Sequence, residues 1–213
     1  MIGSGLDGRN GGFPSSGNAS ASPSFKATFV DLFAGCGGLS LGLENAGFKP
    51  LLVSELNDDA RKTYMANRKS HSKDLYEASD IYNLTNYRLN KIRRDSGGID
   101  LVAGGPPCQG FSGIGHRRSH SVDKRDIPSN HLYEEMIRVI RITQPKVFLF
   151  ENVRGILNSK WDDTGKKVWP DVLKAFSRLN RYTVRPTLVR SYDYGVPQHR
   201  PRVLLVGVRN KLL

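Results

Sequence analysis

The sequence predicts a three-layer α/β fold built on a mostly parallel sheet. Short apolar runs alternate with amphipathic segments from residue 25 onward, and this order is typical of βαβ units. Two of the apolar runs end abruptly in glycine-rich turns, at residues 34–38 and 104–107. In a doubly wound sheet, ligands bind beyond the carboxyl ends of the strands, so we expect the functional residues to follow these runs.

Six apolar runs are the expected strands, and helices are expected between most of them. The strands cover residues 27–33, 50–55, 99–104, 146–151, 183–191 and 202–208. A first helix over residues 38–46 ends before Gly47, which suits the left-handed position after a helix. Asn57 can cap a second helix from residue 58 to about 68, and apolar stripes at helical spacing predict two more, over residues 131–142 and 168–179.

Length and composition predict one globular domain with a core of its own. Of the 213 residues, 38% are hydrophobic and 24% are charged, which is typical of soluble domains. Residues 1–24 are rich in glycine, serine, asparagine and alanine, so we expect a disordered tail before a single domain over residues 25–213. Two cysteines are too few for a disulfide framework, and no apolar stretch approaches membrane-spanning length. With no secretory signal at the start, we expect a cytoplasmic protein, associated with the nucleoid if it is prokaryotic.

The charge of the chain predicts an anionic partner. The formal net charge is +12, and the basic residues are spread along the chain, which favours a charged face over a basic arm. One long connection, from residue 112 to about 130, is basic and contains Arg117 and Arg118. We expect this connection to close over a phosphate backbone; the alternative is a solvated charged loop.

A glycine turn after the first strand indicates a nucleotide-like ligand. Residues 31–38 run from a strand into glycines that open a helix, so backbone amides and the helix N-terminus can face the ligand. The spacing does not match the dinucleotide fingerprint, because Ser40 stands where the third glycine belongs, and there is no Walker lysine. These departures argue against NAD and ATP.

Two acids extend this site toward an adenosine. Glu55 follows the second strand and is well placed to accept hydrogen bonds from two ribose hydroxyls. Asp80 and Ile81, expected at the end of a further strand, offer an acid for an exocyclic amine and an aliphatic side chain for a base, although Asp80 alone fits a surface acid equally well. A glycine turn with these acids and no pyrophosphate site favours S-adenosylmethionine.

Three further motifs follow strands and carry reactive groups. Cys108 comes after a turn of two glycines and two prolines, which places its thiol like a nucleophile at the edge of the sheet. Glu151 begins a Glu-Asn-Val run at the end of another expected strand. Strand alternation predicts that Gln198, Arg200 and Arg202 point to one side; an edge strand with solvated arginines is the alternative.

In this order, the motifs resemble the cytosine-5 methyltransferases of DNA. The resemblance rests on the glycine turn, the two acids, Pro-Cys, Glu-Asn-Val and Gln-x-Arg-x-Arg, and it covers about residues 28–208. It implies a Rossmann-like, S-adenosylmethionine-dependent methyltransferase fold. It also implies methyl transfer to carbon 5 of cytosine in double-stranded DNA, on a base flipped out of the stack, as in restriction-modification systems.

The resemblance implies a role for each matching residue. Cys108 would add to carbon 6 of the cytosine, Glu151 would hold ring nitrogen 3 and the exocyclic amine, and Arg202 would contact the carbonyl at carbon 2. Arg200 would support the site and a nearby phosphate. The residues expected to bind the cofactor are Phe33, Ala34, Gly35, Gly38, Glu55, Asp80, Ile81, Pro107 and Leu132. Those expected to contact DNA are Gln109, Ser112, Arg117, Arg118 and Gln198.

The sequence also departs from the family pattern. Members continue into a target-recognition region and an Asn-containing segment that completes the cofactor pocket, and neither is visible here. Ser79 precedes the adenine acid where glycine is common. The chain would then be a truncated form, a fragment, or the catalytic subunit of an enzyme whose second subunit supplies the missing parts.

Three other functions remain open from the residues alone. The same motifs occur in cytosine-5 methyltransferases of transfer RNA. A non-catalytic module that binds the cofactor would keep the glycine turn. A cysteine hydrolase could pair Cys108 with His116 or His131, but it leaves the turn and Glu55 unexplained. Cys36, inside the turn, is expected to be a small packing residue.

Overall fold

The computed structural model describes residues 26–76, 79–107, 128–161 and 165–213. The tail expected over residues 1–24 lies outside this part of the chain. The same holds for Cys108, for His116 and for four of the residues expected to contact DNA, Gln109, Ser112, Arg117 and Arg118.

A six-stranded sheet forms the centre of the fold, and its strand order is β2-β1-β3-β4-β6-β5. The strands are β1 (Ala27–Leu32), β2 (Phe48–Ser54), β3 (Leu101–Gly104), β4 (Val147–Val153), β5 (Tyr182–Arg190) and β6 (Pro201–Arg209). The first four are parallel, and β6 runs antiparallel to both of its neighbours. The prediction of a mostly parallel sheet is therefore confirmed, although the last two strands form a hairpin rather than a further βαβ unit.

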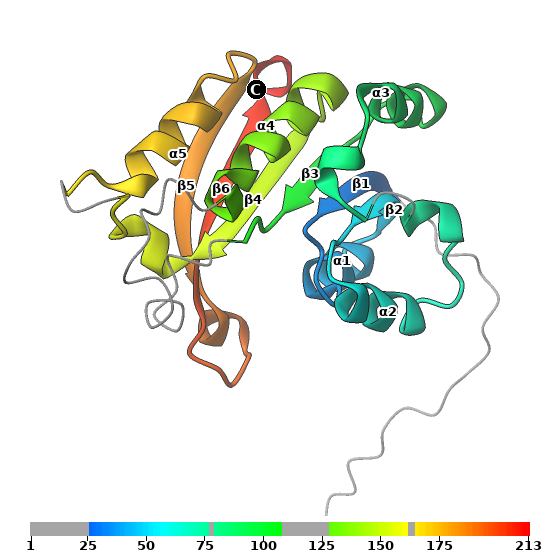
Figure 1. Ribbon diagram of the computed structural model, residues 1–213, viewed down its shortest axis with the longest axis horizontal. Coiled ribbons are helices and arrows are strands. Elements are labelled where there is room, and N and C mark those ends of the chain that lie inside the picture. Colours follow the sequence, from blue (N-terminus) through cyan, green and yellow to red (C-terminus); the bar gives the residue numbers. More distant parts are fainter. Residues whose placement is uncertain (1–25, 77–78, 108–127, 162–164) are drawn as a thin grey trace, which may run out of the picture.

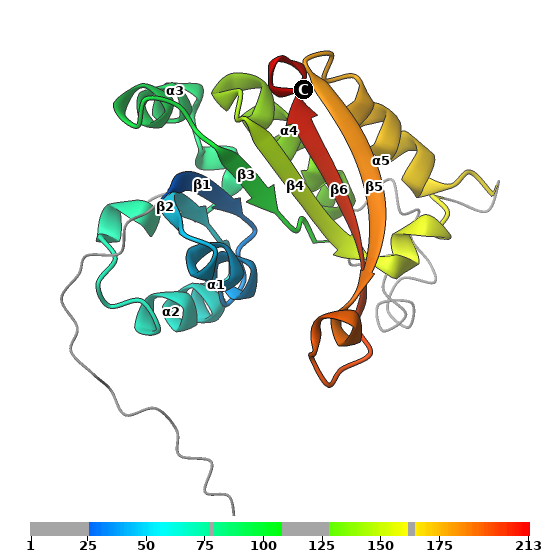
Figure 2. The same cartoon turned by 180° about the vertical axis from the view of Figure 1, so that it is seen from behind.

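Helices cover both faces of this sheet. They are α1 (Gly38–Asn45), α2 (Asp58–Ala66), α3 (Asn86–Asp95), α4 (Leu132–Thr143) and α5 (Val168–Ser177). In Figure 1, α4 and α5 lie in front of β4, β6 and β5, and Figure 2 shows the same strands from behind, now in front of the helices. On the opposite face, α1 packs against Phe29 and Leu101. These layers make the predicted three-layer α/β fold.

The alternation of side chains along the strands explains the two-sided core. In β1, Val30 and Leu32 face the large cluster that includes Met136 of α4, whereas Phe29 faces α1. β3 is buried over its whole length, as expected for a short central strand of a parallel sheet. The sheet is thus held rigidly at its centre, where β1 and β3 end side by side at Leu32 and Gly104.

The structure departs from the sequence analysis in two places, one a helix that was not predicted and the other a strand end that was predicted wrongly. The helix α3 was not predicted, because only Leu89 and Ile92 are buried along its ten residues and the rest of the segment is polar. Asp80 does not follow a strand in the described residues: it caps a short 3₁₀ helix, Ile81–Asn83, and its Oδ1 accepts the Tyr82 amide at 3.0 Å. The acid of this Asx cap was misread as the end of a strand.

Candidate active site and cofactor pocket

The turn after β1 has an unusual backbone conformation. Phe33, Gly35 and Gly37 all have positive φ, at 59°, 57° and 87°. Gly37 requires glycine for a second reason, since a Cβ there would lie 2.4 Å from the ring of Tyr64. The Gly37 amide closes the turn on the Ala34 carbonyl at 2.9 Å, and α1 begins at the next residue. The turn is therefore a tight, preformed corner at the carboxyl edge of β1.

Glu55 ties this turn to the end of β2. One carboxylate oxygen accepts the Gly35 amide and the other accepts the Asn57 amide, each at 2.7 Å. Two amide donors hold the carboxylate plane in place, and each oxygen keeps a second lone pair for a ligand. The hydrogen bond to Gly35 was not foreseeable from the sequence, because it joins residues on two different strand ends.

A pocket of about 250 Å³ opens beside this carboxylate. Of the nine residues expected to bind the cofactor, six line the pocket: Phe33, Glu55, Asp80, Ile81, Pro107 and Leu132. The other lining residues were not predicted, although each is close in sequence to one that was: Ser54, Leu56, Ser79, Tyr82 and Gly105. Two carboxylates among mostly apolar walls suit a ligand with hydroxyl and amine donors and a flat ring.

The other three expected cofactor residues belong to the turn itself. Gly35 donates its amide to Glu55, Gly38 is the first residue of α1, and Ala34 packs with Val53 and Tyr64 in a small core cluster. They shape the corner and do not line the pocket. Cys36 is exposed, so its predicted packing role was wrong: the left-handed residues on both sides turn its side chain out of the core.

Glu151 and Arg202 form an ion pair close to Gly105, which lines the pocket. Arg202 Nε donates to Glu151 Oε1 at 2.6 Å, and the two side chains are 17% and 31% exposed. The pairing of β4 with β6 brings them together, since Arg202 lies opposite Val153 at the start of β6. The ion pair fixes the carboxylate while leaving it open to solvent and ligand.

Gly105 separates this carboxylate from the pocket. It lines the pocket, and a Cβ at Gly105 would lie 3.0 Å from Glu151 Oε2. Any side chain at this position would press on the carboxylate. Because glycine has no side chain, only backbone atoms of Gly105 lie between the Glu151 carboxylate and the pocket.

Asn152 holds the segment that leads to Cys108. It is 4% exposed, and its Nδ2 donates to the Pro106 carbonyl at 3.2 Å while its Oδ1 accepts the Val153 amide at 2.8 Å. Sequence reasoning quoted this residue within Glu-Asn-Val but gave it no role. The signal available in the sequence was the position of this amide side chain directly after Glu151, at the end of an expected strand.

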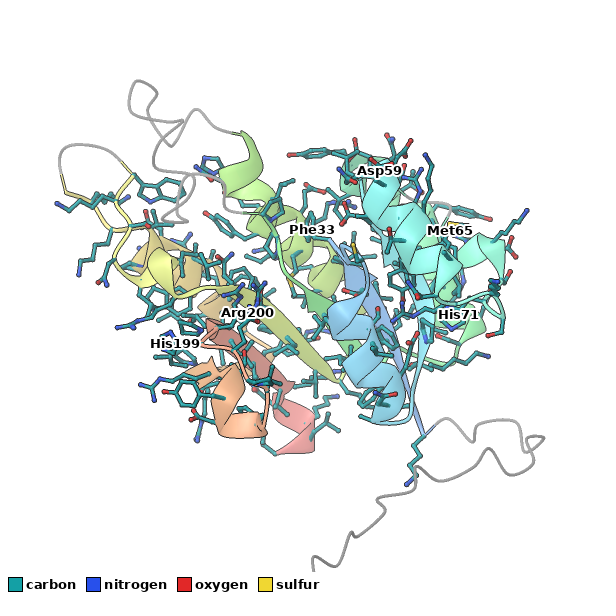
Figure 3. The ribbon with its side chains drawn as sticks, turned by 90° about the horizontal axis from the view of Figure 1, so that it is seen from below. Phe33, Asp59, Met65, His71, His199 and Arg200 are labelled. Atoms are coloured by element: carbon teal, nitrogen blue, oxygen red, sulfur yellow. The ribbon has the colours of Figure 1, made fainter. Side chains whose placement is uncertain are left out.

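Gln198 and Arg200 are placed differently from the prediction. Both are exposed and precede β6, and the amide of each bonds the carbonyl two residues earlier, so the segment is a series of tight turns and not an extended strand. The predicted strand alternation is therefore wrong for Gln198 and Arg200, and of the three residues only Arg202 lies in a strand. Figure 3 shows His199 and Arg200 together on the β5–β6 connection, and His199 stacks on Tyr192 with 5.6 Å between ring centroids.

His131, a partner considered for a hydrolase, makes contacts with described residues. Its ring stacks on Trp161 with 5.3 Å between centroids and 8° between planes, and its Nδ1 lies 3.6 Å from Glu134.

The fold and the site define a class: an α/β enzyme domain with a nucleoside-sized pocket at the carboxyl edge of its parallel strands and a carboxylate–arginine pair beside it. Residues 27–213 match the family model described as C-5 cytosine-specific DNA methylase, and the chain belongs to this family. S-adenosylmethionine is the methyl donor of this family. The resemblance drawn from the motifs is thereby confirmed.

The names of individual relatives are consistent with this family assignment. The chain is 38% identical over 183 residues to the type II methyltransferase M1.HphI of Haemophilus parahaemolyticus, a match covering 84% of this chain and 45% of the relative. It is 37% identical over 181 residues to M.DdeI of Desulfomicrobium norvegicum, covering 85% of this chain and 40% of the relative. The chain thus spans less than half the length of these curated relatives.

Solved structures support the fold. A prophage-encoded E. coli protein, assigned as a DNA modification methyltransferase, superposes with a TM-score of 0.69 at 31% identity, over 88% of this chain and 48% of that one. The Dnmt2 methyltransferase of S. pombe is similar in fold, with a TM-score of 0.59 at 21% identity. Among the helices of the described ranges, none has the length and apolar character needed to cross a bilayer.

Proposed function

We propose that this chain carries the catalytic part of a DNA cytosine-5 methyltransferase, with residues 25–213 as its catalytic domain. In this proposal it transfers a methyl group from S-adenosylmethionine to carbon 5 of a cytosine flipped out of double-stranded DNA. Membership of the family supports the reaction, and the formal charge of +12 supports an anionic partner.

One observation carries the proposal: Gly105 lines the pocket, and a Cβ at this position would lie 3.0 Å from Glu151 Oε2. Methyl transfer needs the donor and the target ring in contact, with no side chain between them. Glycine at this position meets that requirement. Pro107, the last described residue before the predicted nucleophile Cys108, also lines the pocket.

The pocket residues fit S-adenosylmethionine, which supplies an electrophilic methyl group on a sulfonium sulfur. Glu55 would accept the ribose hydroxyls, since both of its oxygens are already oriented by backbone amides. Asp80 would accept the exocyclic amine of the adenine, and Ile81 and Leu132 would pack against the base. Phe33 would close the pocket at the end of β1.

The chain's own residues would activate the cytosine. The Cys108 thiolate would form a bond to carbon 6, and the electron pair displaced from the 5,6 double bond would make carbon 5 nucleophilic. Glu151, held by Arg202, would hold a proton at nitrogen 3 and so stabilise the electron-rich ring. After methylation, loss of the carbon-5 proton would restore the double bond and expel the thiolate.

A trapping experiment tests this chemistry. DNA containing 5-fluorocytosine cannot lose a proton from carbon 5 after methylation, so the enzyme stays covalently attached. We expect the native chain and Cys36→Ser to form the adduct and Cys108→Ser to form none, with its cofactor binding largely intact. Cys36→Ser is the matched control because Cys36 is the only other cysteine. A trapped adduct with Cys108→Ser would contradict the assignment of the nucleophile.

The relatives' greater length supports a second part of the proposal, that target recognition and the rest of the pocket come from sequence beyond this chain. The trap should therefore be run with the chain alone and with the product of the neighbouring gene. A covalent adduct that forms only in the mixture supports a two-subunit enzyme. Methylation of a transfer-RNA hairpin without methylation of duplex DNA would instead favour the RNA-modifying alternative.

A further inference from the structure

A buried polar cluster contacts the glycine turn, and none of its residues lines the cofactor pocket. Its central residue is Arg68, which follows α2 and is only 8% exposed. The neighbours come from three other elements: Gly37 from the turn, Glu44 from α1 and Tyr64 from α2. The side chains of Glu44, Tyr64 and Arg68 were not predicted to belong to the site.

Arg68 makes three contacts at once. Its Nε donates to both oxygens of Glu44, at 3.0 and 2.9 Å, and its Nη2 donates to the Gly37 carbonyl at 2.9 Å. Its guanidinium carbon lies 4.0 Å from the centre of the Tyr64 ring. A planar guanidinium can meet all three partners together, whereas a lysine ammonium can meet only some of them.

The contact with Gly37 falls at a sensitive point of the turn. Gly37 is in the left-handed region and is the N-cap of α1, but no side chain caps that helix. The carbonyl that Arg68 holds belongs to the same residue whose amide closes the turn on Ala34. The Leu41 amide donates to the same carbonyl at 3.0 Å, so Arg68 and the first turn of α1 together fix the Gly37–Gly38 peptide plane.

The opposite side of the same turn is fixed by Glu55. The Gly35 amide donates to Glu55, which lines the pocket, while the Gly37 carbonyl accepts from Arg68 behind it. The turn is thus held between two charged side chains of opposite sign, one on the pocket side and one on the core side. Releasing the core side would leave the Gly35 amide and the Glu55 carboxylate less well aligned.

We propose that Arg68 is a positioning residue for the methyl donor: by joining the Gly37 carbonyl to the Glu44 carboxylate, it holds the glycine turn in the conformation that the cofactor binds. The proposal rests on the proposed binding of S-adenosylmethionine in the pocket. Arg68 does not line that pocket, so it acts through the turn.

The test compares three variants by calorimetric titration with S-adenosylmethionine and by hydrogen exchange of the amides in residues 34–41. Arg68→Met keeps the apolar stem and removes the hydrogen bonds. Arg68→Lys keeps the charge. Arg209→Met is the matched control, because Arg209 also bonds two backbone carbonyls, those of Gln144 and Pro145, at the edge of the sheet away from the turn.

We expect Arg68→Met to bind S-adenosylmethionine about tenfold more weakly, the size expected for losing a charge-assisted hydrogen bond. Its turn amides should exchange faster while those of β1 and β3 stay protected. Arg68→Lys should recover part of the affinity, and Arg209→Met should lose stability without losing affinity. If Arg68→Met does not fold, the comparison of Arg68→Lys with Arg209→Met decides.

Three results would overturn the inference. The first is native affinity in a folded Arg68→Met chain, and the second is native affinity in Arg68→Lys together with unchanged exchange of the turn. The third is an equal loss of affinity in Arg209→Met, which would mean that affinity follows general stability. A folded native chain that does not bind the cofactor would contradict the proposed function, and the exchange of the turn amides would still test the contact with Arg68.

Discussion

Replacing Glu55 with glutamine isolates the two amide hydrogen bonds that join the glycine turn to β2. The carboxylate accepts the Gly35 and Asn57 amides, each at 2.7 Å. A glutamine side chain has a single carbonyl oxygen, so it can serve one of these amides and must turn its NH₂ group toward the other. One backbone N–H therefore loses its partner, and the remaining hydrogen bond loses its charge.

The loss of one amide hydrogen bond and of the charge on the other sets the size of the stability change. A hydrogen bond to a charged group contributes about 1.5–3 kcal/mol, and the half-buried position of Glu55 favours the lower end. We expect Glu55→Gln to lower the free energy of unfolding by about 2 kcal/mol and the Tm by about 4–8 °C for a domain of this size. The affinity for S-adenosylmethionine should fall as well, because the realigned side chain offers only one acceptor to the ribose.

Urea unfolding followed by circular dichroism measures the first effect, and calorimetric titration measures the second. Asp59→Asn is the control, since that side chain is 94% exposed near the start of α2 and its loss should change stability by less than about 0.5 kcal/mol. Equal urea midpoints for the native chain and Glu55→Gln would contradict this prediction, because they would mean that these amides do not depend on the carboxylate.

Two further predictions concern the core. Burial raises the pKa of Asp31 to about 7, so between pH 4 and 7 the folded state binds more protons than the unfolded state, and stability falls as pH rises through this range by at most about 1.4 kcal/mol per pH unit. Asp31→Asn should flatten that part of the profile in urea unfolding measured from pH 4.5 to 8; parallel profiles would contradict it. Gly207→Ala would place a methyl group 2.0 Å from the ring of Phe148 and should cost at least about 1–3 kcal/mol in the same assay. Gly42→Ala, in open space on α1, should instead be stabilising by up to about 1 kcal/mol, and a similar loss in both glycine variants would argue against overpacking.

The sheet could be predicted because burial on both faces leaves a local signal. β3 and β4 are apolar runs whose ends fall within two residues of the predicted bounds. α4 was equally clear, since Met136, Ile137 and Ile140 repeat at helical spacing and are all buried. By contrast, α3 buries only two residues, so its amphipathic signal was too weak.

The site was predictable where a motif stands directly after a strand. Glu55 and Glu151 were found in this way, and both lie at the expected edge. The partners of these acids were harder to predict, because the Gly35 amide reaches Glu55 and the Arg202 guanidinium reaches Glu151 only in three dimensions. Arg200 shows the converse error, since an alternating pattern was read as a strand where the backbone makes successive tight turns.

The position of β6 has a consequence for the order in which the protein assembles. β6 lies between β4 and β5, and β5 has no other neighbour in the described sheet. During synthesis β5 therefore emerges before the strand that can receive it. Glu151 meets Arg202 only when β6 pairs with β4. A nascent chain would complete its cofactor corner early and its ion pair last, so any polypeptide that stops before Pro201 would hold the acid without its arginine.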